Sequence, residues 1–343
     1  MPGKKNRTSK VTLRDIAARA GVSAMTVSLA LRNHPSIPQT THKQIQALAE
    51  AMGYRKDPVV SELMSQLRMK ARSNNAVIAF VTDFEQPFGT LGAQHDIASL
   101  EGARQRAENE GFAIEEFQIN ARMSADRLEN VLWNRGVRGI LVGPLRQPNT
   151  RLELKLDRFA AVAIGHTLSA PSIHRVSNNQ MQSMLLAMRR LSEQGHKRIS
   201  VILSGGAEGR VRARWRAGFL LARETLDIDP DSSYQEPGGF ADMRSFRKWL
   251  RQHRPDAILT NQLDCIPAAA RPPRTGSADN ASPVIAFLHL LKDQHAGVRG
   301  IDQQWFKLGS IAVGALTRQM YNHEYGVPED PYLIQIDGKW VDG

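Results

Sequence analysis

The chain has 343 residues, of which 41% are hydrophobic and 23% charged, a composition typical of a soluble globular protein with room for two or three domains. No apolar run approaches the ~20 residues of a membrane span. The basic N-terminus lacks the apolar stretch of a secretory signal. The single cysteine, Cys265, excludes an internal disulfide framework and a cysteine-based zinc finger. We therefore expect a cytoplasmic protein that neither binds a membrane nor carries a cofactor.

Positive charge is concentrated at the N-terminal end of the chain. Residues 1–72 contain 13 Lys and Arg against 4 Asp and Glu, so +9 of the net charge of +11 lies in this segment. Such a concentration predicts binding to a polyanion. A basic, solvated tail accounts for residues 1–10, but not for the periodic segment that follows them.

That segment begins with a predicted helix between Thr12 and Gly21. Thr12 is a typical helix cap, and Asp15 lies near the positive end of the helix dipole. Gly21 tolerates the left-handed backbone at which helices often end. Between them, apolar residues recur at helical spacing and form one face: Leu13, Ile16, Ala17 and Ala20.

Two more helices follow after short connections. The second begins at Ser23 and turns Val27, Ala30 and Leu31 inward. The third runs over about 39–52 and ends at Gly53, with Ile45, Leu48, Ala49 and Met52 inward. Two helices joined by a short glycine-containing turn predict a helix-turn-helix head, whose second helix enters the major groove of DNA.

Several short motifs at fixed spacing make this pattern more specific. They are Thr12-Leu13-Arg14-Asp15-Ile16-Ala17, Ala20-Gly21-Val22-Ser23, Thr26-Val27-Ser28 and Gly53-Tyr54. With these residues the head resembles that of the lac-repressor (LacI/GalR) family of transcriptional regulators. The resemblance implies sequence-specific binding of double-stranded DNA and no enzymatic activity.

The resemblance also implies which residues contact DNA. Ala24, Met25 and Leu29 match positions that face base edges, and Thr26 and Ser28 match hydroxyls that contact phosphates. The full expected set is Thr12, Ser23, Ala24, Met25, Thr26, Ser28, Leu29, Arg32, Tyr54 and Leu63. Leu29 stands where the family usually has an arginine, so guanine recognition is replaced by apolar contact, for example with a thymine methyl. The alternative is that Met25 and Leu29 belong to the core of the head.

A short hinge is predicted after the head. Residues 57–68 can form a helix that begins at Asp57 or Pro58 and has an apolar side, but a helix so short is marginal alone in water. In the resembling family this helix folds when two copies pair on DNA, and a leucine wedges into the minor groove. Leu63 matches that leucine. The alternative is a simple linker whose leucines pack on the core.

The rest of the chain predicts an α/β core. Strand-like apolar runs over 76–81, 113–118, 139–142, 161–164, 198–203, 257–259 and 284–287 alternate with predicted helices over 97–110, 125–134, 179–194, 212–224 and 243–252. This alternation predicts parallel sheets wrapped by helices, and the length suits two lobes. The expected domains are a helix-turn-helix domain at 1–57, a hinge at 58–73 and a two-lobed effector-binding and dimerisation domain at 74–343.

The core also resembles the two-lobed, periplasmic-binding-protein-like domain of the same family. The matching residues are Gly102-Ala103, Gly111-Phe112, Arg138-Gly139-Ile140, Leu191 with Gly195-His196-Lys197-Arg198-Ile199, Ala217-Gly218-Phe219, Gly300-Ile301-Asp302-Gln303, Gly309, Ala312-Val313 and the closing segment 338–343. The resemblance implies a small effector, a sugar or sugar derivative, between the lobes. Its expected contacts are Asp83, Phe84, Phe88, Asn179, Trp215, Asn261 and His289, together with Pro87 and Asn178.

Three departures bear on this effector site. Trp215 replaces an arginine, His289 replaces an acidic residue, and the Pro-rich segment 266–273 replaces a helix. Trp215 could stack on a sugar or an aromatic ring, or it could be a core residue. The segment 203–210 follows a strand and could hold an anion on backbone N–H groups. It lacks the Lys-Ser/Thr of a phosphate-binding loop, so we interpret it as a loop lining the cleft.

Other classes of protein fit less well. No nucleophile-and-base constellation, G-x-S-x-G motif or metal-ligand spacing supports an enzyme. A free solute-binding protein would need a secretory signal and no head. The sequence therefore predicts a dimeric, allosteric regulator, a repressor by resemblance, that binds a pseudo-palindromic operator. The alternative is a dimeric DNA-binding regulator whose core has lost effector binding.

Overall fold

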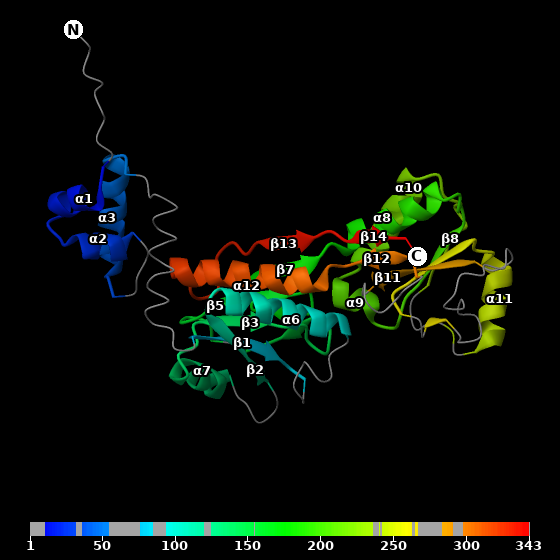
Figure 1. Ribbon diagram of the computed structural model, residues 1–343, viewed down its shortest axis with the longest axis horizontal. Coiled ribbons are helices and arrows are strands. Elements are labelled where there is room, and N and C mark those ends of the chain that lie inside the picture. Colours follow the sequence, from blue (N-terminus) through cyan, green and yellow to red (C-terminus); the bar gives the residue numbers. More distant parts are fainter. Residues whose placement is uncertain are drawn as a thin grey trace, which may run out of the picture.

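The protein is described by a computed structural model over residues 11–31, 36–54, 76–84, 94–119, 125–153, 155–235, 240, 242–262, 265–266, 283–290 and 298–342. A helical head is followed by two α/β lobes (Figure 1). The predicted hinge at 58–73 lies outside the described residues. Within the described part, no helix is long and apolar enough to cross a membrane.

The head contains the three predicted helices, α1 (Leu13–Ala20), α2 (Ala24–Ala30) and α3 (Gln39–Ala51). Thr12 and Asp15 form a reciprocal capping box at the start of α1, in which each side chain accepts a hydrogen bond from the other residue's backbone N–H. At the end of α3, Gly53 adopts a φ of 69° and Tyr54 N–H donates to the Ala49 carbonyl at 2.9 Å. This left-handed cap stops the helix.

One small hydrophobic cluster holds the head together. Its buried members are Ile16, Ala17, Val27, Ala30, Ile45 and Ala49, two from each helix. The helical spacing seen in the sequence therefore predicted the inward face of each helix correctly.

The first lobe is built on a six-stranded parallel sheet in the order β13-β7-β5-β3-β1-β2. Its strands are β1 (Ala76–Thr82), β2 (Phe112–Gln118), β3 (Gly139–Val142), β5 (Ala160–Ile164), β7 (His174–Asn178) and β13 (Leu333–Ile336). Helices α6 (Gln94–Asn109) and α12 (Trp305–Asn322) cover one face, and α7 (Ala125–Asn134) covers the other. A two-stranded ribbon of β4 (Thr150–Arg151) and β6 (Leu168–Ala170) lies beside the sheet.

The second lobe repeats the plan with the order β14-β12-β11-β10-β8-β9. Its strands are β8 (Ile199–Ile202), β9 (Tyr234–Gln235), β10 (Ala257–Thr260), β11 (Val284–Leu290), β12 (Gly300–Asp302) and β14 (Lys339–Val341), and only β14 is antiparallel to its neighbour. Helices α8 (Gln180–Glu193) and α10 (Arg214–Thr225) pack on one face, and α11 (Met243–His253) packs on the other. The predicted α/β class and parallel sheets are confirmed.

The chain crosses between the lobes three times, from β7 into α8, from β12 into α12 and from β13 into β14 (Figure 1). Sequence patterns did not predict α12, which returns from the second lobe and packs along α6. At this contact the helices approach so closely that a Cβ on Gly309 would lie 1.7 Å from the Ser99 carbonyl oxygen.

One predicted helix is interrupted. The helix expected over 212–224 begins instead at Arg214, and a separate turn of helix, α9 (Ala207–Val211), precedes it. Arg212 and Ala213 between them have φ values of 53° and 57°, in the left-handed region. This break ends α9, and α10 begins directly after it at Arg214.

Candidate functional sites

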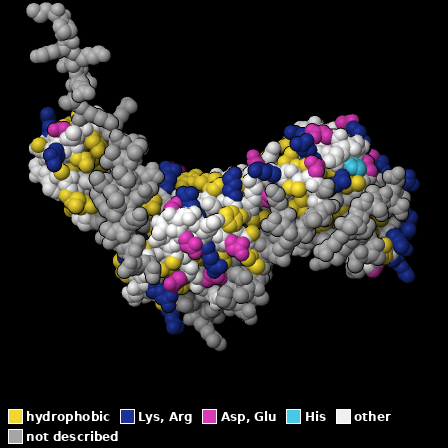
Figure 2. Space-filling view, in the orientation of Figure 1, with side chains coloured by type: hydrophobic (Ala, Val, Ile, Leu, Met, Phe, Trp, Pro, Cys, Tyr) yellow, Lys and Arg dark blue, Asp and Glu magenta, His cyan; other side chains and the backbone are white. Residues whose placement is uncertain are grey.

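The outward face of α2 is the candidate DNA-reading surface. Met25 is 62% exposed, whereas Val27 and Ala30 on the same helix are fully buried in the head. Leu29 is half-buried and lies outside the head's hydrophobic cluster, and Ala24 packs against that cluster. Hydrophobic side chains reach the surface of the head in Figure 2. The helix thus presents apolar rather than charged groups near its exposed start.

Hydroxyl groups organise the start of α2. The Ser23 Oγ accepts a hydrogen bond from the Thr26 N–H at 3.0 Å and lies 2.9 Å from the Thr26 Oγ1. Thr12 is engaged in the α1 cap, where its hydroxyl donates to the Asp15 carboxylate at 2.7 Å. This hydrogen bond lowers the pKa of Asp15 below its ordinary value. Ser28 is half-buried on α2.

Tyr54 and one residue without an assigned role fix the third helix. Tyr54 is half-buried against the hydrophobic cluster of the head. His42 on α3 is buried, and its Nδ1 lies 2.8 Å from the Ala30 carbonyl at the end of α2, so the ring donates the bond. A lone histidine gave no sequence signal for this contact. Arg32 and Leu63 lie outside the described residues.

The three crossings are tied together by amide and carboxylate side chains. The Asn178 Nδ2 donates to the Gln303 carbonyl at 2.6 Å, and the Asn179 Nδ2 donates to the Asp337 carboxylate at 2.8 Å. The Gln304 Nε2 donates to the Asp337 carbonyl at 2.7 Å. Every pair joins two different crossings. Asn179, predicted to contact the effector, takes part in these hydrogen-bonded crossings, and its contact with an effector stays a prediction.

Two other expected effector residues support loops where strands end. Asp83 follows β1 and accepts a hydrogen bond from the Arg146 N–H at 2.8 Å. Asn261 follows β10, and its amide accepts from the Ser204 N–H at 2.8 Å and donates to the Ser204 hydroxyl at 2.7 Å. Both are at the carboxyl ends of parallel strands, where ligands bind in open α/β sheets.

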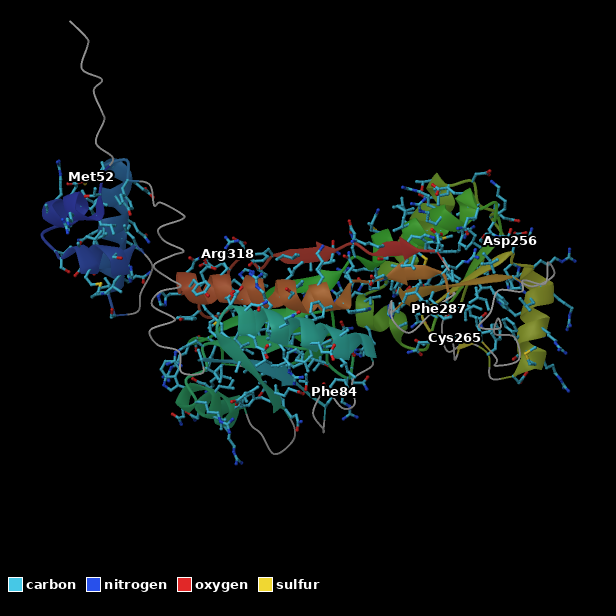
Figure 3. All side chains as sticks on the ribbon, in the orientation of Figure 1. Met52, Phe84, Asp256, Cys265, Phe287 and Arg318 are labelled. Carbon is cyan, nitrogen blue, oxygen red and sulfur yellow. The ribbon has the colours of Figure 1, made fainter. Side chains whose placement is uncertain are left out.

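The aromatic candidates differ in their surroundings. Phe84 packs partly buried at the end of β1 nearest the second lobe (Figure 3). Trp215 is only 1% exposed and lies in the core of the second lobe, which matches the core alternative. Its ring centroid is 5.6 Å from that of His289, which is 5.5 Å from that of Trp305. Trp305, which begins α12, was not singled out from the sequence. Phe88 and Pro87 lie outside the described residues.

Arginines of the second lobe reach across to the first. The Arg210 Nη1 donates to the carbonyls of Leu145 and Arg146 at 2.9 and 3.0 Å. The Arg212 Nη2 donates to the Leu168 carbonyl at 3.0 Å. These bonds hold α9 and the residue after it against the first lobe. Residues 207–210 of the segment predicted as a loop form the start of this helix, and its lining of the cleft stays a prediction.

Two further basic residues, Arg175 and Arg214, and the buried His166 accompany Arg212 at this junction. Burial, and then the positive charges of Arg214, Arg175 and Arg212, lower the pKa of His166 to about 3. Burial, followed by Arg212 and Arg214, lowers the pKa of Arg175 to about 10. The positive charges of the three guanidinium groups therefore lie close together at the junction, although they come from separate segments of the chain.

A helix-turn-helix head joined to a two-lobed core with a hinge defines a class of DNA-binding transcriptional regulators. Residues 12–57 match the family model described as "Bacterial regulatory proteins, lacI family". The chain is 24% identical to the regulator MalR of Staphylococcus xylosus over 259 residues, which cover 73% of each protein. It is 25% identical to the repressor CytR of Escherichia coli (strain K12) over 246 residues, 70% of this chain and 67% of that protein. Two Streptomyces regulators also match, and the alignment spans 53% of each.

Solved structures share the fold. The lac repressor bound to ONPG in its repressed state aligns with 97% of this chain and 99% of its own, at 18% identity and a TM-score of 0.53. The complex of the regulator CelR with cellobiose aligns with 97% and 98%, at 17% identity and a TM-score of 0.50. The chain is therefore a transcriptional regulator whose head matches the lacI family model and whose core has the fold of the lac repressor.

Proposed function

We propose that the protein is a repressor that binds a pseudo-palindromic DNA operator as a homodimer, and that a small molecule bound between its lobes changes its affinity for DNA. One head offers few contacts, whereas two heads related by a two-fold axis match two half-sites. The name of the relative CytR, a repressor, supports the sign of the regulation. DNA-binding residues, effector residues and the domain limits at 57 and 73 are part of this proposal.

The observation that carries the proposal is the outward face of α2. A helix whose inner residues are fully buried while Met25 is 62% exposed is held rigidly by its neighbours with its reading side free. The surplus of positive charge over residues 1–72 supplies phosphate contacts around it. Apolar groups at Met25 and Leu29 favour A·T pairs, because thymine offers a methyl group in the major groove.

Selection from random duplex DNA by the full chain tests this function. We expect one enriched motif with two inverted half-sites, and tighter binding to the full site than to one half-site. Enrichment of no motif would contradict sequence-specific binding. Equal affinity for a half-site and a full site would contradict the homodimer.

The hydrogen-bonded crossings between the lobes support control by an effector. The three crossings, tied by Asn178, Asn179, Gln303 and Asp337, are where the lobes would rotate relative to each other. The CelR structure, named as a cellobiose complex, and the lac repressor structure, named as bound to ONPG, favour a sugar or a sugar derivative as effector here. Closure of the lobes would change the spacing of the two heads and hence operator affinity.

A second candidate is a regulator whose core binds no effector. Two of the predicted effector contacts favour it. Trp215 is buried in the core, and the Asn261 amide is hydrogen-bonded to Ser204. Calorimetric titration with neutral sugars, sugar phosphates and sugar acids separates the two. Binding that changes operator affinity supports the effector-controlled repressor, and absence of any binding supports the second candidate.

A further inference from the structure

The junction between the lobes holds basic groups from both sides. Arg175 lies on β7 and His166 follows β5, both in the first lobe. Arg212 lies between α9 and α10 and Arg214 begins α10, both in the second lobe. The Arg175 Nη2 and the Arg212 Nη2 donate to the same acceptor, the Leu168 carbonyl, at 2.9 and 3.0 Å. Two guanidinium groups from opposite lobes therefore lie side by side.

Within the described part of the chain, the hydrogen-bond partners of these three arginines are all backbone carbonyls. Besides the shared Leu168 oxygen, Arg175 donates to the Gly165 carbonyl at 2.6 Å and Arg214 donates to the Val211 carbonyl at 3.0 Å. Among the described residues, no carboxylate forms an ion pair with Arg175, Arg212 or Arg214. Buried or half-buried charges are ordinarily paired, so the missing partner calls for an explanation.

The histidine at the inner end of the group points to the same conclusion. His166 is 4% exposed, and its Nε2 is buried without a hydrogen-bond partner. Exposure increases outward from it, since Arg175 and Arg214 are half-buried and Arg212 is exposed. The group therefore runs from a buried, unsatisfied nitrogen to a surface that a ligand can reach.

We propose that an anionic group of a small molecule, a phosphate or a carboxylate, binds between Arg175, Arg212, Arg214 and His166 as their missing counter-ion. Arginine presents forked donors that match both kinds of oxyanion, and the His166 Nε2 can supply a further hydrogen bond to the anion. The proposal rests on the proposed function and narrows the effector to an acidic compound, such as a sugar phosphate or a sugar acid.

The placement of the charges gives the anion a mechanical consequence. Without a counter-ion, Arg175 on one lobe repels Arg212 and Arg214 on the other, which opposes closure. An anion between them turns this repulsion into attraction from both sides, so it binds the closed arrangement more tightly than the open one. A ligand shifts a conformational equilibrium only through such a difference in affinity.

The test is calorimetric titration and thermal unfolding of the full chain at constant ionic strength in chloride. The probes are inorganic phosphate, glucose 6-phosphate, gluconate and neutral glucose. The variant is R212Q/R214Q, and the matched control is R216Q, which removes an exposed arginine from the same segment. Circular dichroism and operator binding show that each variant is folded. The result expected is binding of phosphate or of an acidic sugar but not of glucose, weakened about tenfold or more per arginine in R212Q/R214Q and unchanged in R216Q.

Different outcomes separate this proposal from the proposed function. Phosphate-bearing and carboxylate-bearing probes compared at equal charge identify which acid the site prefers. Binding of glucose but not of the anions, with a change in operator affinity, would overturn the anionic site while leaving effector control intact. Anion binding that leaves operator affinity unchanged would support the site but contradict effector control. No preference for anions over chloride, or equal binding by wild type and R212Q/R214Q, would overturn the proposal.

Discussion

At the residue scale, the proposed recognition of bases depends on Met25 and Leu29. Met25 projects from the start of α2, and Leu29 lies one turn later outside the cluster formed by Val27, Ala30 and their neighbours. The resemblance to the family predicted that these two positions face the bases. In the structure, neither side chain belongs to the hydrophobic cluster of the head. Arginine at position 29 would place two donors opposite a guanine, which leucine cannot do.

We therefore predict that Leu29→Arg changes the preferred operator toward a guanine at one symmetric pair of positions. A mismatched base pair costs roughly 1–3 kcal/mol, so selection from random DNA by the two proteins will resolve the change. In the wild type, uracil in place of the contacted thymine should weaken binding. An identical consensus for both proteins would mean that Leu29 does not face the bases.

His166 provides a second prediction at this scale. Its pKa is lowered to about 3 by burial and by Arg214, Arg175 and Arg212, against about 6.5 in an unfolded chain. Between these values the unfolded state binds the proton and the folded state does not. His166 therefore costs the folded state about 1.4 kcal/mol for each pH unit from pH 6.5 down to pH 3, and nothing above pH 6.5.

The His166→Asn variant should lack this pH-dependent loss of stability. Denaturant unfolding in chloride buffers between pH 7 and pH 4 should show the variant gaining stability relative to wild type as the pH falls. The other titratable residues are the same in both proteins, so the difference between the two stability curves reports on His166. Parallel stability curves over this range would show that the imidazole is protonated in the folded protein.

At the element scale, hydrophobic patterns in the sequence predicted the elements whose burial is regular along the chain. The strands β1, β3, β5 and β10 are buried on both faces, so they appear as continuous apolar runs, and the head helices show one inward stripe each. Helix α12 did not stand out, because its buried residues cover a broad face against α6 and the sheet and include Thr317 and Gln319. No stripe separates such a helix from its surroundings.

Sequence patterns also did not predict the cluster of basic residues between the lobes, which consists of His166, Arg175, Arg212 and Arg214. The break between α9 and α10 depends on left-handed backbone at Arg212 and Ala213, and neither residue type marks that conformation in a sequence. His166, Arg175 and Arg214 come from three segments that only the tertiary fold brings together. Leu63 and the hinge helix lie outside the described residues, so the wedge in the minor groove stays a prediction.

The contact between α6 and α12 gives a prediction for a matched pair of glycines. A Cβ on Gly309 would lie 1.7 Å from the Ser99 carbonyl oxygen, whereas a Cβ on Gly314 of the same helix would be 3.6 Å from the Arg106 Nη2. Gly309→Ala should destabilise the first lobe by about 1–3 kcal/mol or more, since rigid backbone must move. Gly314→Ala should stabilise it by up to about 1 kcal/mol through helix propensity.

Thermal unfolding of the two variants checks this contact. The melting temperature should fall for Gly309→Ala and stay level or rise for Gly314→Ala. Equal changes in both would mean that α6 and α12 do not meet at backbone distance.

At the scale of the whole molecule, the net charge lies in the N-terminal segment, and the crossings lie between the two lobes of the core. Residues 1–72 hold nearly all of the net charge, which suits non-specific attraction to DNA, while the core is close to neutral apart from the arginines between its lobes. The three hydrogen-bonded crossings would, under the proposed control, carry a change between the lobes to the ends of the core. Under the proposed control, effector and operator must each change the affinity for the other by the same factor.

The salt dependence of operator binding by the full chain tests the central claim most directly. A head that neutralises several phosphates with the cations of residues 1–72 releases counter-ions, so the logarithm of the affinity should fall linearly with the logarithm of the salt concentration. Between about 50 and about 200 mM salt we expect a loss of about a thousandfold for six or more phosphate contacts. The selected site should remain preferred over random DNA at every concentration. An affinity that does not change over this range, or equal affinity for selected and random DNA, would contradict the account.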